Sequence, residues 1–241
     1  GIMCVPRHSN PTGDTYSDEN IISIIEAGKA YSEEFLCIFD HAYLLHDFLP
    51  SPSQTPVWEL ATQLDAKDQV AVFCSFSKVT FGGGGLAFAA AGKKLFDLLS
   101  RQRASMIVCS DKVNQKRHLE FLKDKAGVIE HMKKHAEIVR PKFEVAFDAL
   151  DALSPEIGTY QKPTGGYFIS YDAKRPIAKR VIELCKEVGV LITPAGSTYP
   201  HFHDPLDSNI RLAPTFLGVE DLQDAMEVFV TAIMIAHQEL D

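Results

Sequence analysis

The stretch Val70-Ala71-Val72-Phe73-Cys74-Ser75-Phe76-Ser77-Lys78 decides the fold, and the four glycines Gly82 to Gly85 follow it closely. Its first five residues form a continuous apolar run, which predicts a buried strand. Lys78 is therefore expected just beyond the carboxyl end of a strand, where open α/β sheets bind their ligands. The serine hydroxyls can donate to an anion, and the glycines allow a ligand to approach the backbone closely. This setting suits a reactive amine beside an anion, although a solvated loop lysine is the simpler interpretation of the stretch alone.

Further apolar and amphipathic runs predict the other elements. The expected strands are 2–5, 35–39, 70–74, 86–91, 166–171, 190–192 and 209–212. One helix is expected to begin at 17–19. The other expected helices are 57–64, 94–102, 112–123, 129–153, 178–188 and 219–239. The helix 129–153 is expected to bend at Pro141. Asn10-Pro11-Thr12-Gly13 is a predicted turn. Alternation of apolar strands with helices favours an α/β fold with a mostly parallel sheet covered on both faces, and a second domain is expected after about residue 153.

Composition limits the classes of function. The 241 residues are 46% hydrophobic, typical of a globular protein, and the net charge of −8 argues against nucleic acid or an anionic membrane as the main partner. No apolar run is long enough to span a bilayer. The five cysteines are scattered without a paired spacing, which predicts a reducing, cytoplasmic compartment. The abrupt start on a strand predicts that further chain precedes Gly1.

Acidic and imidazole side chains follow the predicted strand 35–39. Asp40 ends this run and Tyr43 lies three residues later. An acid in this place can bind a metal, act as a general base or pair with a cation, whereas a turn or cap aspartate is the common alternative. His41 and His46 lie close by, but the set does not have a recognised metal-ligand spacing.

Arg211 lies inside the apolar run Ile210 to Ala213. Such an arginine is either an edge-strand residue or a buried receptor for an anion, since its planar fork binds carboxylates with two hydrogen bonds. The two interpretations are equally supported by the run itself. His201 and His203 are expected in a surface loop, with a role in a substrate pocket as the minor alternative.

A rival motif also fits the Lys78 stretch. Ser75-Phe76-Ser77-Lys78 matches S-x-x-K, the signature of serine acyl-enzymes. That chemistry requires S-D-N and K-T-G downstream. The chain instead has Asp207-Ser208-Asn209 and Lys162-Pro163-Thr164-Gly165, neither of which has the required order.

Four motifs together resemble those of the fold-type I pyridoxal phosphate enzymes, the aminotransferase class I/II superfamily. In chain order they are Asn10-Pro11-Thr12-Gly13, Asp40-x-x-Tyr43, Ser75-x-Ser77-Lys78 and Arg211. The amino-acid sequence also resembles that of the atypical Ic bacterial aspartate aminotransferases, also called MocR-like aminotransferases. The similar stretches are 5–19, 75–88, 111–118, 162–170 and 209–216. The resemblance covers essentially the whole chain.

The resemblance implies pyridoxal 5'-phosphate as the cofactor and a role for each matched residue. Lys78 would carry the Schiff base with the cofactor and then move the proton during the reaction. Asp40 would pair with the pyridinium nitrogen and keep the ring an electron sink. Asn10 and Tyr43 would hydrogen-bond the phenolic oxygen.

The same resemblance implies the anion contacts. Ser75 and Ser77 would bind the cofactor phosphate, and Arg211 would bind the substrate α-carboxylate. Many relatives carry a phosphate-binding arginine eight residues after the lysine, but this chain has Leu86 there. Backbone amides of the glycine run, the serines or residues outside the chain must then replace it.

The implied activity is ping-pong transamination between an amino acid and a 2-oxo acid, with aspartate and 2-oxoglutarate as the expected pair. Residues 1–153 would belong to the large cofactor-binding domain, including the long interdomain helix, and residues 154–241 would form the small domain. Relatives carry more chain before the matched part, so this chain alone is expected to lack activity. A homodimer with shared active sites is expected. Two alternatives remain: a lyase or decarboxylase of the same fold, and an aminotransferase-like effector domain of a transcription regulator.

Overall fold

The computed structural model describes residues 1–241 and divides into two compact units. The first unit contains residues 1–9 and 15–134, and the second contains residues 10–14 and 135–241. Each unit has its own sheet and its own buried core. The two are therefore described separately.

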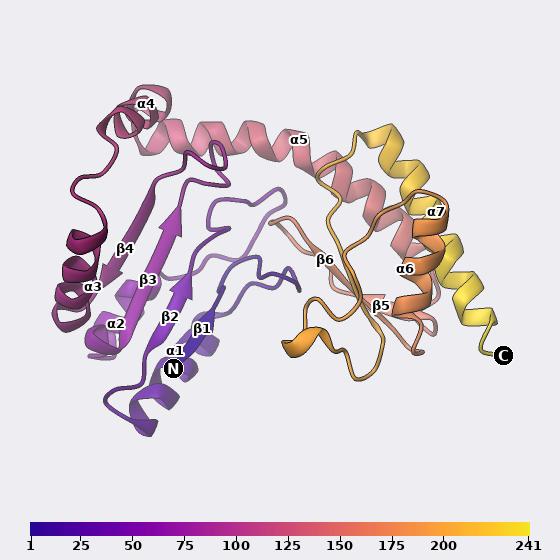
Figure 1. Ribbon diagram of the computed structural model, residues 1–241, viewed down its shortest axis with the longest axis horizontal. Coiled ribbons are helices and arrows are strands. Elements are labelled where there is room, and N and C mark those ends of the chain that lie inside the picture. The colour runs from indigo at the N-terminus through magenta and orange to yellow at the C-terminus, as the bar shows by residue number, and fades with distance from the viewer. The chain divides into compact units, whose positions relative to one another are not determined.

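A four-stranded sheet forms the centre of the first unit (Figure 1). Its strands are, in spatial order, β1 (Ile2–Cys4), β2 (Cys37–Asp40), β3 (Val70–Ser75) and β4 (Ala87–Ala91). The first three are parallel, as the apolar runs predicted, and Asp40 pairs with Phe73. β4 is antiparallel to β3, because the short glycine-rich connection reverses the chain and cannot make a parallel crossover.

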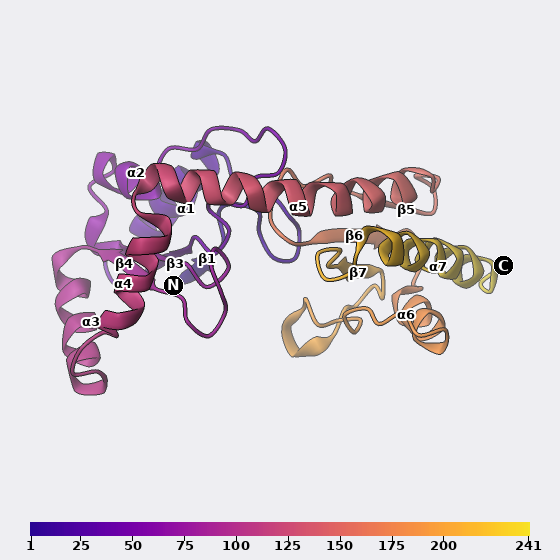
Figure 2. The same ribbon diagram turned by 90° about the horizontal axis from the view of Figure 1, so that it is seen from above.

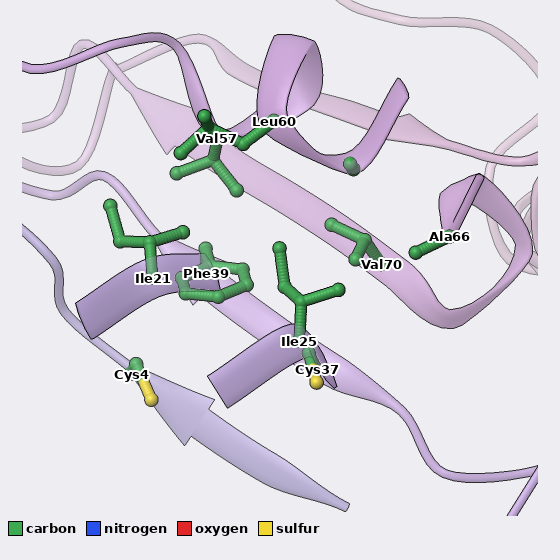
Figure 3. Packing of buried hydrophobic residues seen from close by; sticks show 10 residues of the cluster. Cys4, Ile21, Ile25, Cys37, Phe39, Val57, Leu60, Ala66 and Val70 are labelled. Carbon is green, nitrogen blue, oxygen red and sulfur yellow. The ribbon is translucent and has the colours of Figure 1, made fainter. Parts of the chain in front are cut away.

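Helices of the first unit begin near the predicted places. They are α1 (Asp18–Tyr31), α2 (Val57–Gln63), the 3-10 turn η1 (Lys67–Gln69), α3 (Lys93–Met106) and α4 (Lys112–Leu122), with the start of α5 (Lys125–Asp151). Ser17 caps α1, accepting a hydrogen bond from the Asn20 amide at 3.2 Å. Figure 3 shows side chains of α1 and α2, including Ile21, Ile25 and Leu60, meeting Phe39 and Val70 of the sheet.

β4 differs from the expectation of a sheet covered on both faces. Its residues Ala87 to Ala90 are exposed although the run is apolar. β4 is the last strand in the sheet order, so only β3 pairs with it. The helix α3 that follows it has no buried residue.

The second unit contains a three-stranded antiparallel sheet with two long helices on it. Its strands are β5 (Gly158–Tyr160), β6 (Ile169–Ala173) and β7 (Asn209–Leu212), and its helices are α6 (Ala178–Glu187), α7 (Val219–Gln238) and the 3-10 turn η2 (Pro200–Phe202), with the end of α5. Tyr171 of β6 and Phe229 of α7 are both buried, and their ring centroids lie 6.0 Å apart. Both views show α5 as one unbroken helix (Figures 1 and 2), and Pro141 lies inside it.

One predicted strand is wrong and one was missed. Residues 190–192 form no strand, because the Val190 amide bonds back to the Cys185 carbonyl at 2.9 Å and closes the end of α6. Gly189 permits this reversal with φ +91°. β5 was missed because it is only three residues long. The predicted turn at Asn10 to Gly13 is present, and Gly13 takes φ +76°. None of the helices combines the length and hydrophobicity needed to cross a bilayer.

Candidate active site

The ends of β2 and β3 bring Asp40 and Lys78 to one edge of the first sheet. The two strands are parallel neighbours, so their carboxyl ends share this edge. Asp40 is the last residue of β2, and the next amide, of His41, donates to the Phe73 carbonyl of β3 at 2.7 Å. Lys78 follows β3 by three residues, in a turn closed by hydrogen bonds from the Val79 and Thr80 amides to the Phe76 carbonyl.

Lys78 lies over the ring of Tyr43. Its ammonium nitrogen is 4.9 Å from the ring centroid, a cation–π distance. Tyr43 is buried, whereas Lys78 is exposed. Two of the sequence-predicted site residues are thus in contact, although 35 positions separate them in the chain. The amine is held at the surface by a buried aromatic platform, where a ligand can reach it.

Ser75 and Ser77 present their hydroxyls beside this turn. The Ser77 amide donates to the Ser75 hydroxyl at 3.4 Å. Gly85 packs directly against Ser77: a Cβ atom at Gly85 would come within 2.6 Å of the Ser77 nitrogen. The Leu86 carbonyl accepts from the Phe76 amide at 2.7 Å. The glycine run is therefore folded back onto the serines.

The surroundings of Asp40 are partly apolar. Burial raises the pKa of the Cys74 thiol, and the nearby Asp40 charge raises it further. Burial lowers the pKa of His41 more than Asp40 raises it, so His41 is neutral near pH 7. The chain contains no group of three or more His, Cys, Asp or Glu side chains placed to hold a metal ion.

A charged cluster missed by the sequence interpretation supports the loop after Asp40. Asp47 Oδ1 accepts from Arg7 Nη2 at 2.7 Å and lies 2.8 Å from His8 Nε2. Burial raises the pKa of Asp47, but hydrogen bonds from His8 and Ser51 and the charge of Arg7 outweigh it and lower the pKa to about 2. Arg7 is thus engaged within the protein by Asp47. No spacing in the sequence indicated this pairing.

The second unit brings Arg211 and Asn10 together. Arg211 Nη1 donates to Asn10 Oδ1 at 2.9 Å, and its guanidinium carbon lies 4.7 Å from the Phe168 ring centroid. Its buried Nε has no hydrogen-bond partner. The predicted His201 and His203 are exposed in and after η2, as expected for a surface loop.

An apolar cavity of about 130 Å³ adjoins Arg211. Residues 190–193, of which 190–192 were predicted as a strand, line it together with side chains of α7 such as Met226 and Phe229. Arg211 therefore borders this largely apolar cavity and contacts two polar neighbours, Asn10 and Thr193. This arrangement suits a ligand with a carboxylate attached to a carbon skeleton.

Comparison with known proteins agrees with the fold. The profile of the family described as aspartate amino-transferase matches residues 1–240. An aspartate aminotransferase of Corynebacterium glutamicum is 34% identical over 99% of this chain. The crystal structure of an aspartate transaminase from Corynebacterium glutamicum superposes with a TM-score of 0.92 at 32% identity, covering 98% of this chain.

A more distant structure, the α-aminoadipate aminotransferase LysN of Thermus thermophilus, shares the fold with a TM-score of 0.81, 23% identity and 98% coverage of this chain. That enzyme was crystallised with N-(5'-phosphopyridoxyl)-L-leucine, and this chain covers 59% of it. The fold is therefore that of the fold-type I pyridoxal phosphate-dependent aminotransferases. The chain belongs to the aspartate amino-transferase family. It spans 56% of the length of the Corynebacterium glutamicum relative.

Proposed function

We propose that the protein to which this chain belongs is a pyridoxal phosphate-dependent aminotransferase. The observation that supports it most strongly is the joint position of Asp40 and Lys78 at the carboxyl ends of adjacent parallel strands. Membership of the aspartate amino-transferase family supports the same reaction class. The rival serine acyl-enzyme interpretation has no such support.

The residues of the first unit fit the cofactor by their chemistry. Asp40 is a carboxylate at a strand end and can hold a protonated pyridine nitrogen. Ser75 and Ser77 offer hydroxyls for a phosphate, beside glycines whose backbone is accessible: a Cβ atom at Gly82 would meet nothing within 4 Å. Tyr43 offers a hydroxyl for the phenolic oxygen, and Lys78 offers the amine. In the second unit, Asn10 is the other partner proposed for the phenolic oxygen.

When bound, the cofactor supplies an electron sink that stabilises negative charge on the substrate α-carbon. The Lys78 amine would then be the group that takes the proton from that carbon and passes it to the C4′ atom of the cofactor. Its contact with Tyr43 keeps the flexible side chain within a limited region, which lowers the entropic cost of reaching the reacting atom. The buried ring also excludes water from one side of the amine.

Arg211 is the proposed receptor for the substrate α-carboxylate. Asn10 and Phe168 fix the plane of its guanidinium by a hydrogen bond and by ring stacking. A guanidinium held in one plane can bind both carboxylate oxygens with little further loss of rotamer freedom. The adjoining apolar cavity offers a surface for the rest of the ligand.

The finer parts of the proposal concern substrates and assembly. We favour aspartate and 2-oxoglutarate as the pair, because the family and the Corynebacterium glutamicum relative are named for aspartate. We propose residues 1–153 as part of the large domain, residues 154–241 as the small domain, and a cytoplasmic homodimer with shared active sites. No observation favours the lyase, decarboxylase or regulator alternatives over transamination.

A substrate assay on the full-length protein tests this function. The protein is incubated with pyridoxal phosphate, aspartate and 2-oxoglutarate, and glutamate and oxaloacetate are measured. Transamination predicts equal amounts of the two products and none without the 2-oxo acid after the first turnover. Release of ammonia or carbon dioxide without need for a 2-oxo acid would instead establish elimination or decarboxylation.

A further inference from the structure

Three successive residues of the Lys78 turn are each held by a different histidine. The Lys78 carbonyl lies 3.1 Å from His46 Nε2, and the Val79 carbonyl lies 2.7 Å from His131 Nε2. The Thr80 hydroxyl lies 2.9 Å from His118 Nε2. The three imidazoles come from the loop after β2, from α5 and from α4, all within the first unit. Figure 1 shows α4 and the start of α5 beyond the carboxyl end of β3, where this turn lies.

The direction of two of these hydrogen bonds follows from the chemistry. A peptide carbonyl only accepts, so the Nε2 atoms of His46 and His131 must each carry a proton and donate. Both the Nε2–H neutral tautomer and the imidazolium do so. His118 differs, because its Nδ1 lies 2.9 Å from the Asn114 carbonyl and must donate there. In the neutral ring its Nε2 then accepts the single hydroxyl proton of Thr80, for which the Phe76 carbonyl at 3.1 Å is the competing acceptor.

Each ring is also fixed by an aromatic neighbour. His46 meets Tyr43 edge to face at 5.7 Å, and His131 meets Phe121 at 5.2 Å. His118 stacks against Phe76 and Phe81 at 6.0 and 5.6 Å. His46 and His118 are only 3% and 4% exposed. Rings held in this way can fix the turn, because they lose little further freedom when they form their hydrogen bonds.

The His46 contact joins the turn to the amine's own platform. Tyr43 touches both the His46 ring and the Lys78 ammonium group. The His46 amide also bonds to the Tyr43 carbonyl at 3.1 Å. One side chain therefore fixes both the backbone of Lys78 and the surface on which its amine rests.

From this geometry we infer that His46 and His131 are positioning residues, which hold the Lys78 turn by donating to two successive carbonyls and thereby set the place of the Lys78 amine. His118 supports the same turn through Thr80. The inference rests on the proposed function for what the amine does, but the turn can be examined without cofactor. None of these histidines touches the reacting atoms on this account.

The test compares donor-retaining with donor-lacking substitutions. His46→Gln and His131→Gln keep an N–H at about the same reach, whereas His46→Leu and His131→Leu remove it at similar volume. Amide hydrogen exchange of Val79 and Thr80 is measured without cofactor, since both amides close the turn. The Leu variants are expected to exchange these two amides about tenfold faster, and the Gln variants to restore most of the protection. Unchanged exchange in Leu variants, or equal behaviour of Gln and Leu variants, would overturn the inference.

A second readout uses bound pyridoxal phosphate. The pH midpoint of the visible absorbance band is expected to shift in His46→Leu and to return in His46→Gln, which a loss of packing alone would not produce. Should a Leu variant not fold, Thr80→Val, which removes the hydroxyl that contacts both His118 and the Phe76 carbonyl, must still raise exchange at Thr80. If the exchange results are as expected but the unsubstituted protein shows no Lys78-dependent band, the proposed function is wrong while the positioning role of His46 and His131 is confirmed. If the unsubstituted protein shows the Lys78-dependent band but the Leu variants exchange normally, only the positioning role of the histidines is wrong.

Discussion

The Lys78 ammonium group lies 4.9 Å from the centroid of the buried Tyr43 ring. The two residues come from loops after neighbouring parallel strands, so the sheet itself brings them together. This relationship places an amine on a rigid surface beside the serines and glycines that follow β3. The predictions below concern the groups around it.

Gly85→Ala is expected to disturb the backbone at Ser77, a residue proposed to bind the cofactor phosphate. The added Cβ would lie 2.6 Å from the Ser77 nitrogen and 2.7 Å from its Cα, so the backbone must move. We expect a loss of about 1–3 kcal/mol, shared between folding and cofactor binding. Calorimetric titration with pyridoxal phosphate measures the part of this loss that falls on cofactor binding. Gly82→Ala is the matched control, because nothing lies within 4 Å of its added Cβ. Equal effects of the two substitutions would contradict the close packing of Gly85 against Ser77.

Arg211→Lys is expected to weaken substrate binding although the positive charge remains. Lysine cannot form two parallel hydrogen bonds to a carboxylate, nor stack on Phe168 as a plane. The loss of a charge-assisted hydrogen bond corresponds to an increase of roughly tenfold to a hundredfold in KM. Steady-state kinetics of the full-length protein measure it. A normal KM in Arg211→Lys would contradict the role given to Arg211.

Asp47→Asn is expected to reduce stability at neutral pH by about 1–2 kcal/mol, because it leaves Arg7 and His8 without their anion. The pKa of Asp47 is about 2 in the folded protein, below its usual 3.8. Its stabilising contribution is therefore complete above about pH 4 and is lost as the pH falls through 2. Denaturant unfolding between pH 7 and 2 should show the two proteins converge at the acid end. A difference that stays constant over this range would contradict the ionic role of Asp47.

The five cysteines are expected to differ sharply in reactivity. Cys109 is exposed, whereas Cys185 is fully buried and burial raises its pKa to about 11. Because the thiolate is the nucleophile, Cys109 should react first with a disulfide reagent at pH 8 and Cys185 only after unfolding. Peptide mass spectrometry at successive times identifies the labelled sites. Early labelling of Cys185 would contradict the packing of α6.

Much of the fold followed from the sequence because its parallel strands are apolar throughout. β2 and β3 lie within one or two residues of their predicted ranges, and α1 begins at Asp18, within the predicted 17–19. Residues 190–192 are apolar for another reason: they line a cavity against α7. Periodicity alone does not distinguish a short strand from an extended apolar segment. β4 was predicted as a strand, but its antiparallel direction and its exposure depend on partners that the run does not encode.

The site was only partly accessible to sequence reasoning. Positions at strand ends indicated Asp40 and Lys78, and the structure brings Tyr43 to Lys78 and Asn10 to Arg211. The histidines that hold the turn were not found, because their partners are backbone carbonyls that carry no residue-type signal. His46 was considered only as a metal ligand. The Arg7–Asp47 pair was missed because 40 positions separate its members.

The most direct test of the proposed function is an absorbance spectrum of the full-length protein with pyridoxal phosphate, recorded beside Lys78→Ala. The account predicts a visible band in the unsubstituted protein that Lys78→Ala lacks, and that aspartate bleaches. Borohydride reduction followed by peptide mass spectrometry should then find the cofactor on Lys78. A band that persists in Lys78→Ala, or a cofactor attached to another lysine, would contradict the central role of Lys78.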